Sequence, residues 1–310
     1  MNEKLPIIFF EPIIKETVWG GERLKEFGYT VPSAHCGEAW IFSAHKSGDC
    51  KTSFHGLTLS ELWKNHREVF GNLAGETFPI MIKIIDAQTD SSIQVHPTDA
   101  YAKLHENGER GKTECWFILD CKKNARIIIG HNAKTKAELQ TMIAEKKWSS
   151  LLREKPIHAG DFFFIEAGTV HAIKGGTLLL EVQEASDITY RVYDYDRITN
   201  GKLRPLHLEK SLDVIEVPFV EKKCATKQND VTIHRNIKLL ASCNYFSVGK
   251  LSIHGNETLS QSKQFLLCSV IAGAGFVDGF AIRKGANFML PYLYGSAQFS
   301  GDMEIVFSWV

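Results

Sequence analysis

The chain has 310 residues, of which 44% are hydrophobic and 11% aromatic, so it can bury one large core or two smaller ones. Lys and Arg total 36, as do Asp and Glu, and the zero formal charge argues against the broad basic surface of a nucleic-acid-binding protein. The seven cysteines are an odd number without CxxC or CxxxC spacing, so neither a disulfide framework nor a cysteine zinc site is expected.

Three stretches of the sequence predict helices. They are Thr58–Phe70, Thr98–Glu106 and Thr135–Trp148. The first begins with Thr58 and Glu61, which have the spacing of a capping box. The third begins with a comparable pair, Thr135 and Glu138. We expect these helices to decorate a β core.

Strand signals outnumber helix signals. Short runs rich in β-branched and aromatic residues recur between Gly, Asn and Asp, at spacings typical of a β-sandwich or barrel. These runs are Pro79–Ala87, Arg126–Ile129, Asp161–Glu166, Thr177–Gln183 and Thr189–Tyr195. No GxGxxG or GxxxxGK[ST] motif follows a strand, so neither a dinucleotide-binding fold nor a P-loop is supported.

The pattern changes after about residue 215. The polar stretch Glu221–Asp230 is interpreted as a linker between a domain over residues 1–220 and a smaller β domain over residues 231–310. Strands are predicted in the smaller domain at Phe246–Ile253, Phe265–Ile271 and Glu304–Trp309. This domain contains no cluster of metal-ligating or acid–base residues in sequence, so a structural role is expected.

Candidate metal ligands occur in three separate segments. Gln94 and His96 project from the same face if residues 91–96 form a strand, because side chains alternate along a strand. Glu114 begins an otherwise apolar strand, where a buried carboxylate must be solvated, paired or metal-bound. His171 follows the strand over 161–166 and a turn at Ala167-Gly168, and we predict a hairpin-like unit there.

The segment that ends at His171 resembles the second motif of the cupin superfamily. Gly160, Gly168 and His171 match that motif, while Glu166 stands in place of its usual Pro, and Gly175 stands where Asn is frequent. The Gln94-x-His96 pair resembles the first cupin motif with Gln in place of the first His. More specifically, the chain resembles the type I mannose-6-phosphate isomerase (phosphomannose isomerase) family in its short bacterial form, over roughly residues 5–215. The supporting stretches are Gly37–Trp40, Phe78–Lys83, Ser92–Tyr101, Gly111–Leu119, Glu166–Ala172 and Glu184–Arg197.

The resemblance implies a mainly β, cupin-type jelly-roll barrel with helical insertions and a smaller C-terminal β domain. It also implies interconversion of mannose 6-phosphate and fructose 6-phosphate through a cis-enediol, with one zinc ion per chain and an active-site arginine at Arg191. The implied zinc ligands are Gln94, His96, Glu114 and His171. Two imidazoles, a carboxylate and an amide suit Zn²⁺ but also permit Mn²⁺, Fe²⁺ or Co²⁺.

Several further residues are candidates for contact with a phosphorylated sugar. Arg191 offers fixed, permanently charged donors to an enediolate or a phosphate. The proton-transferring base stays open among Glu181, Lys112 and a metal-bound hydroxide. The other candidate contacts are Ser92, Lys83, Asp187 and Arg197. The histidines outside the ligand set, His207 among them, show no paired spacing and are expected to be structural or exposed.

Two alternatives stay open: an isomerase of another 6-phosphorylated aldose, and a catalytically silent cupin that binds a sugar phosphate. A cupin dioxygenase is disfavoured because Gln94 replaces an expected His. The first residues show no signal-peptide pattern, and the longest apolar runs are too short to cross a bilayer. We therefore expect a cytoplasmic monomer or homodimer whose partner is a small-molecule sugar phosphate, with no membrane or nucleic-acid partner.

Overall fold

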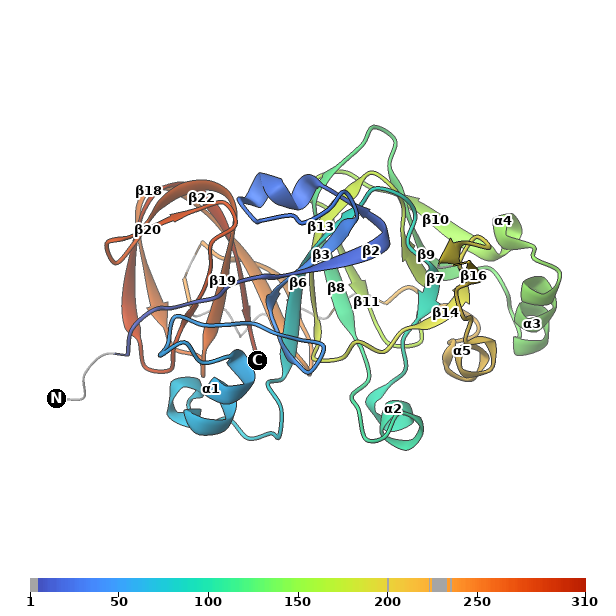
Figure 1. Ribbon diagram of the computed structural model, residues 1–310, viewed down its shortest axis with the longest axis horizontal. Coiled ribbons are helices and arrows are strands. Elements are labelled where there is room, and N and C mark those ends of the chain that lie inside the picture. Colours follow the sequence, from blue (N-terminus) through green and yellow to red (C-terminus); the bar gives the residue numbers. More distant parts are fainter. Residues whose placement is uncertain (1–4, 200, 223, 225–232, 235) are drawn as a thin grey trace.

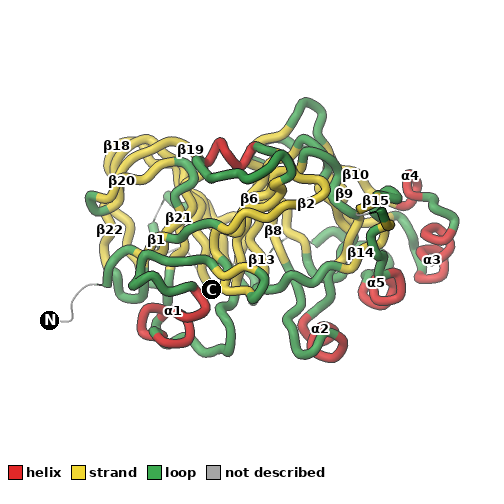
Figure 2. The backbone as a smooth tube through the Cα atoms, viewed as in Figure 1, coloured by secondary structure: helices red, strands yellow, loops and turns green. Residues whose placement is uncertain are grey.

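A computed structural model of the chain describes residues 5–310 except 200, 223, 225–232 and 235. Strands dominate the interior and helices lie at the periphery (Figure 2). None of the helices in these ranges has the length and apolar character needed to span a bilayer. The mainly β, cupin-type fold predicted from the sequence is confirmed.

Two antiparallel sheets form the domain that carries the candidate ligands. The six-stranded sheet has the order β11 (Phe162–Ile165), β8 (Glu114–Cys121), β13 (Thr177–Glu184), β6 (Ile80–Ala87), β2 (Ile13–Gly21) and β3 (Cys36–Phe42). The five-stranded sheet has the order β10 (Leu152–Pro156), β9 (Arg126–His131), β12 (His171–Ile173), β7 (Ile93–Val95) and β14 (Tyr190–Tyr193). Trp116 and Leu179 from the first sheet and Ile127 from the second pack in one buried cluster, so the sheets face each other.

The third sheet belongs mainly to the C-terminal part of the chain, which lies at the opposite end of the molecule from α3 (Figure 1). Its order is β1 (Ile8–Phe9), β21 (Asn287–Leu290), β19 (Leu266–Val277), β22 (Gly295–Trp309), β18 (Ser247–Gln261) and β17 (Lys238–Ser242), with β20 (Phe280–Arg283) paired to β19. The N-terminal strand β1 thus joins the C-terminal sheet. The predicted linker Glu221–Asp230 lies mostly outside the described residues, and the predicted boundaries at 220 and 231 stay predictions.

The central strands β6 and β13 of the six-stranded sheet are buried on both faces, which explains their continuous apolar sequences. Every residue of β6 is buried, and Ile82 and Ile84 share a cluster with Leu267 and Val306 of the C-terminal sheet. A short apolar run without alternation is typical of a strand covered on both sides.

Helices cover the outer face of the five-stranded sheet. Leu139 and Ile143 of α3 (Lys136–Ala144) pack with Val95 and Ala172 of that sheet, and α4 (Trp148–Leu151) and α5 (Leu208–Val214) lie beside them (Figure 1). The remaining elements are α1 (Leu59–Asn65), α2 (Asp99–His105), the 3₁₀ helices η1 (Arg23–Phe27) and η2 (Arg67–Phe70), and the hairpins β4–β5 (Ala44–His45, Gly48–Asp49) and β15–β16 (Ile198–Thr199, Lys202–Leu203).

All three predicted helices form, though with shorter or divided bounds. The capping box of Thr58 and Glu61 at α1 is confirmed, with both reciprocal bonds present. At α3, Thr135 caps the helix, but the Glu138 carboxylate accepts from the amide of Lys134. Helix α5 was not predicted.

The hairpin-like unit predicted around Ala167-Gly168 is wrong. Strand β11 pairs with β8, whereas β12, which begins at His171, pairs with β7 and β9 in the facing sheet. Gly168 adopts φ +88°, a left-handed conformation that glycine tolerates, at the turn where the chain passes from one sheet to the other. Local sequence spacing cannot distinguish such a crossing from a hairpin.

Candidate metal centre and active site

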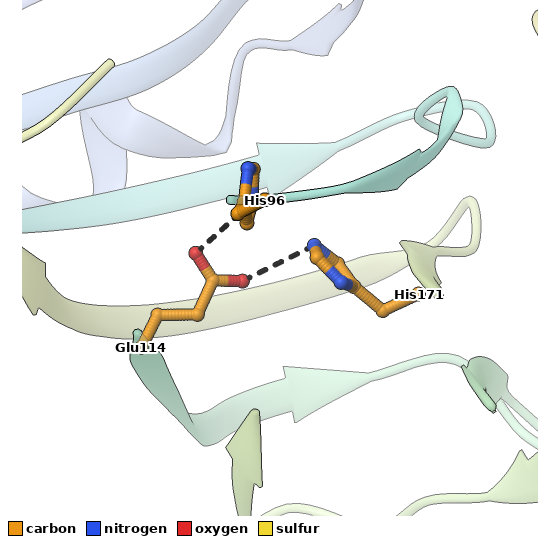
Figure 3. A group of neighbouring side chains, drawn as sticks. All are labelled: His96, Glu114 and His171. Carbon is orange, nitrogen blue, oxygen red and sulfur yellow. Dashed lines mark ion pairs between the residues drawn. The ribbon is translucent and has the colours of Figure 1, made fainter. Parts of the chain in front are cut away.

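Three side chains converge between the two sheets (Figure 3): Glu114 and His171 begin strands β8 and β12, and His96 directly follows strand β7. His96 Nε2 lies 3.5 Å from Glu114 Oε2, and His171 Nε2 lies 3.4 Å from Glu114 Oε1. Potential ligand atoms of the three residues all lie within 4.8 Å of one another, and all three side chains are buried. Two ligands bound about 2.1 Å from a tetrahedral ion lie roughly 3.4 Å apart, so the spacing fits a divalent metal.

The two histidines have the tautomer that metal binding requires. His96 Nδ1 lies 2.7 Å from the carbonyl oxygen of Ile188, and His171 Nδ1 lies 2.8 Å from that of Thr169. A carbonyl oxygen only accepts, so each Nδ1 carries the proton and each Nε2 has a free lone pair. Such backbone bonds hold ligating histidines in orientation.

Several buried polar atoms at this centre make no hydrogen bond among the described residues. They are His96 Nε2 and both carboxylate oxygens of Glu114, of which Oε2 lies 2.8 Å from the Lys112 ammonium group. Burial lowers the pKa of His96 well below its usual range and that of His171 to about 4, so both rings are neutral. Buried acceptors without a partner are costly, and a bound cation would satisfy these lone pairs. The residues present therefore fit a metal ion.

Gln94 lies beside these three residues because strand β7 pairs with strand β12. It pairs with His171 on one side, and its amide Nε2 lies 3.2 Å from His171 Nε2. Ser92 Oγ donates to Gln94 Oε1 at 3.3 Å. A 180° flip of the Gln94 amide group exchanges the positions of its oxygen and nitrogen atoms. The flipped amide would place Oε1, a possible metal ligand, beside His171 Nε2.

A buried network of lysines and carboxylates adjoins the metal centre. Lys112 Nζ lies 2.8 Å from Glu114 Oε2 and 3.7 Å from Glu181 Oε2. Lys83 Nζ lies 3.3 Å from Glu38 and 3.8 Å from Glu181. The indole Nε1 of Trp116 donates to Glu181 Oε1 at 3.0 Å. The network therefore holds Glu181 between two ammonium groups and an indole donor.

The charges in this network shift the pKa values of its members. Burial lowers the pKa of Lys112, but the adjacent Glu114 and Glu181 carboxylates outweigh burial and raise it above its ordinary value. Burial raises the pKa of Glu181, and the charge of Glu114 adds to that effect. Lys112 is thus held as a cation, while Glu181 has a greater affinity for protons than an exposed glutamate.

These groups line a cavity of about 460 Å³ beside the metal centre. Gln94 lines it, as do six of the seven residues predicted to be catalytic or to contact substrate: Lys83, Ser92, Lys112, Glu181, Asp187 and Arg191. Arg197 does not line it. The Arg197 guanidinium instead bonds to Asp194, and to the carbonyl oxygen of Asp90 at 2.6 Å.

Comparison with known proteins identifies the family. The family model for the type I phosphomannose isomerase catalytic domain matches residues 8–117, and that for the mannose-6-phosphate isomerase cupin domain matches residues 236–310. The chain is 49% identical to mannose-6-phosphate isomerase ManA of Bacillus subtilis, with 97% of this chain and 98% of that protein covered. The chain belongs to the type I phosphomannose isomerases.

Other relatives agree in sequence and structure. A mannose-6-phosphate isomerase of Streptococcus mutans is 43% identical, with 97% of each chain covered. A crystal structure of mannose 6-phosphate isomerase from Bacillus subtilis superposes with a TM-score of 0.94 at 43% identity, covering 98% of this chain and 99% of that one. As a type I phosphomannose isomerase, the chain is an enzyme of a metal-dependent family.

In this type I phosphomannose isomerase the cavity also contains residues that were not singled out from the sequence. They include Glu38, Trp19, Arg204 and His207. Glu38 lies in the Gly37–Trp40 stretch that supported the family resemblance, so a signal for it existed. Arg204 and His207 come after a surface hairpin and had no local signal, and His207 was expected to be structural or exposed.

Proposed function

We propose that this enzyme interconverts mannose 6-phosphate and fructose 6-phosphate, with zinc held by His96, Glu114, His171 and Gln94. The observation that carries the proposal is the convergence of unpartnered, buried ligand atoms beside a cavity rich in charged groups. The names of the relatives at 43–49% identity support the substrate. Two neutral imidazoles and a carboxylate are typical donors to Zn²⁺, and the Gln94 amide oxygen would complete a four-coordinate site.

The reaction moves a proton between C1 and C2 of an open-chain sugar. When bound, the metal would supply Lewis-acid polarisation of the oxygen atoms on those carbons. Lys112 contributes a fixed positive charge next to the ligand Glu114 and lines the cavity, so it stabilises negative charge that develops on the substrate. Arg191, opposite Gln94, offers further fixed donors to an anionic substrate.

We assign the proton transfer to Glu181. Its carboxylate lines the cavity, is 3% exposed, and is oriented by the indole of Trp116. Its raised proton affinity suits a group that takes a proton from one carbon and returns it to the next. Lys112 is a poor base because two carboxylates keep it protonated. Asp187 and Lys83, 3.8 Å apart, line the same cavity and are proposed to bind sugar hydroxyls, as is Ser92.

A coupled isomerase assay on the purified enzyme tests this function. We expect turnover of mannose 6-phosphate, loss of turnover after chelation, and recovery when Zn²⁺ is returned. Full activity in enzyme shown by elemental analysis to be metal-free would overturn the metal assignment. Binding of mannose 6-phosphate without turnover in the zinc-loaded protein would instead indicate a silent sugar-phosphate-binding cupin. Faster turnover of another 6-phosphorylated aldose would reassign the substrate.

A further inference from the structure

Arg191 is a half-buried cation whose side chain makes no hydrogen bond or ion pair with any described residue. Its guanidinium lines the cavity, and its Nε is buried without a partner. The lysines in the same cavity, by contrast, all pair with carboxylates. Burial lowers the pKa of Arg191 and the nearby charge of Arg204 lowers it further, while the charges of Asp194 and Asp187 act in the opposite direction. A half-buried arginine that makes no ion pair and lies near a second arginine is stabilised when an anion binds between the two.

A row of side chains runs from the metal ligands to the edge of the five-stranded sheet. His171 lies opposite Gln94, and Gln94 lies opposite Arg191 on β14. On the outer side of β14, the backbone N–H of His207 donates to the carbonyl of Arg191 at 2.8 Å. Directly opposed residues of antiparallel strands share one face, so the ligands and Arg191 project together. The cavity-lining His207 extends this row by one further position.

His207 presents a hydrogen-bond donor at this end of the cavity. Its Nδ1 accepts from the backbone N–H of Arg191 at 3.0 Å. A neutral imidazole that accepts through Nδ1 carries its proton on Nε2, so the remaining polar atom of the ring is a donor.

Arg204 adds a second guanidinium, positioned by a buried carboxylate. Its Nη1 donates to both oxygens of Asp194, at 3.3 and 3.1 Å. Asp194 is shared with Arg197, whose Nη2 lies 3.2 Å away. One carboxylate therefore bonds to two arginines, while Arg191 makes no direct ion pair with a described carboxylate and the nearby Asp187 pairs with Lys83. Positive charge is in excess at this end of the cavity.

We infer that Arg204 and His207, together with Arg191, bind the phosphate group of the substrate; this rests on the proposed function. A phosphate monoester carries about −1.5 to −2 charges at pH 7, which matches the excess of arginine over carboxylate. Guanidinium forks bind phosphate oxygens in pairs, and the His207 N–H supplies another donor. The phosphate lies at the far end of a hexose from C1 and C2, and His207 lies at the end of the row away from His171, with Gln94 and Arg191 between them. Asp194 is a positioning residue for Arg204.

Steady-state kinetics on Arg204→Gln and His207→Asn test the assignment. His207→Asn keeps an acceptor for the Arg191 amide but loses the Nε2 donor. For Arg204→Gln we expect KM for mannose 6-phosphate to rise about 10- to 100-fold with kcat within a few-fold of wild type. Inhibition by inorganic phosphate should weaken by a similar factor, while kcat/KM for unphosphorylated mannose stays unchanged. Arg204→Lys should be intermediate, and His207→Asn should shift the same constants by a smaller factor.

Arg126→Gln, a substitution of a surface arginine paired with Glu154, is the control for loss of charge alone. If Arg204→Gln keeps the wild-type KM and phosphate inhibition, or lowers kcat for phosphorylated and unphosphorylated sugar alike, the phosphate assignment is wrong. Either of these results would leave the proposed function intact, provided that the wild-type enzyme is an active isomerase. A zinc-loaded wild-type enzyme without isomerase activity would overturn the proposed function itself.

Discussion

Arg191 lies directly opposite Gln94 on the antiparallel strands β14 and β7, and the strand register slips between Arg191 and Tyr193. This register shift is an irregularity of the strand pairing beside the metal centre. Irregularities such as β-bulges change the direction in which nearby side chains point. Register thus brings a permanently charged side chain next to a proposed zinc ligand, although the two residues are far apart in sequence.

Replacing Glu114 by Gln should abolish metal retention. The variant loses the charge that faces both imidazoles and leaves Lys112 without its nearest carboxylate. Changes in outer-shell partners alone cost about 10- to 100-fold, so activity should fall by more than about 100-fold. Elemental analysis after gel filtration measures the bound metal. Glu109→Gln, which removes a carboxylate from an exposed ion pair with Lys46, is the matched control. An E114Q enzyme that keeps its full metal content would contradict the ligand assignment.

Replacing Trp116 by Phe should move the acid limb of the kcat/KM pH profile upward. The substitution removes the indole N–H that stabilises the Glu181 carboxylate, so the pKa of Glu181 rises further. A base must be deprotonated to act, and a higher pKa therefore shifts the onset of activity to higher pH, by about one unit for one lost hydrogen bond. Trp63→Phe, in an aromatic cluster with Phe70 and Phe78, is the control. An unmoved limb would exclude Glu181 as the base.

Replacing Glu184 by Gln should stabilise the fold at high pH only. Burial, with the charge of Asp99, raises the pKa of Glu184 from 4.5 to about 7. The folded state then binds the proton more tightly than the unfolded state, so ionisation costs stability progressively as pH rises from about 4.5 to 7. Glutamine keeps the oxygen that accepts from the Thr113 amide at 2.8 Å.

Urea unfolding at pH 5 and pH 8 measures this effect. The gain in unfolding free energy from E184Q should be on the order of 2–3 kcal/mol at pH 8 and small at pH 5. Glu22→Gln, at an exposed position, should change neither value. A gain of equal size at both pH values would show that ionisation of Glu184 is not the cause.

Replacing Phe265 by Ala should destabilise the contact between the C-terminal sheet and the catalytic domain. The Phe265 ring is fully buried and lies 5.8 and 5.1 Å, centroid to centroid, from the rings of Phe70 and Phe78. Truncating a buried phenylalanine costs about 3–5 kcal/mol. Denaturant unfolding should show this loss, whereas Phe276→Ala, at a half-exposed position, should change stability by less than about 0.5 kcal/mol. A small loss for F265A would mean that the two parts do not share a core.

Local chemistry explains which elements could be predicted from the sequence. The capped starts of α1 and α3 depend on side chains within a few residues of one another, and the buried strands β6 and β13 depend on apolar runs. His96, Glu114 and His171 were predicted as ligands from their segments and family motifs, and the structure brings these three together. The Gln94 amide lies beside them, and its role as a ligand stays a prediction.

The sequence by itself determined the fold family, the three side chains that converge as candidate metal ligands, and the helix caps, because each depends on neighbours in the chain or on motifs of recognisable spacing. Only the tertiary structure decided that β11 and β12 lie in different sheets, and that β1 pairs with β21 almost 280 residues away. It alone also brought His207 beside Arg191, through a backbone hydrogen bond at the edge of a sheet, and placed Arg204 at the same cavity. Packing between segments that are distant in the sequence determines which strands pair. The residues adjacent to a strand in the sequence therefore do not indicate its partner.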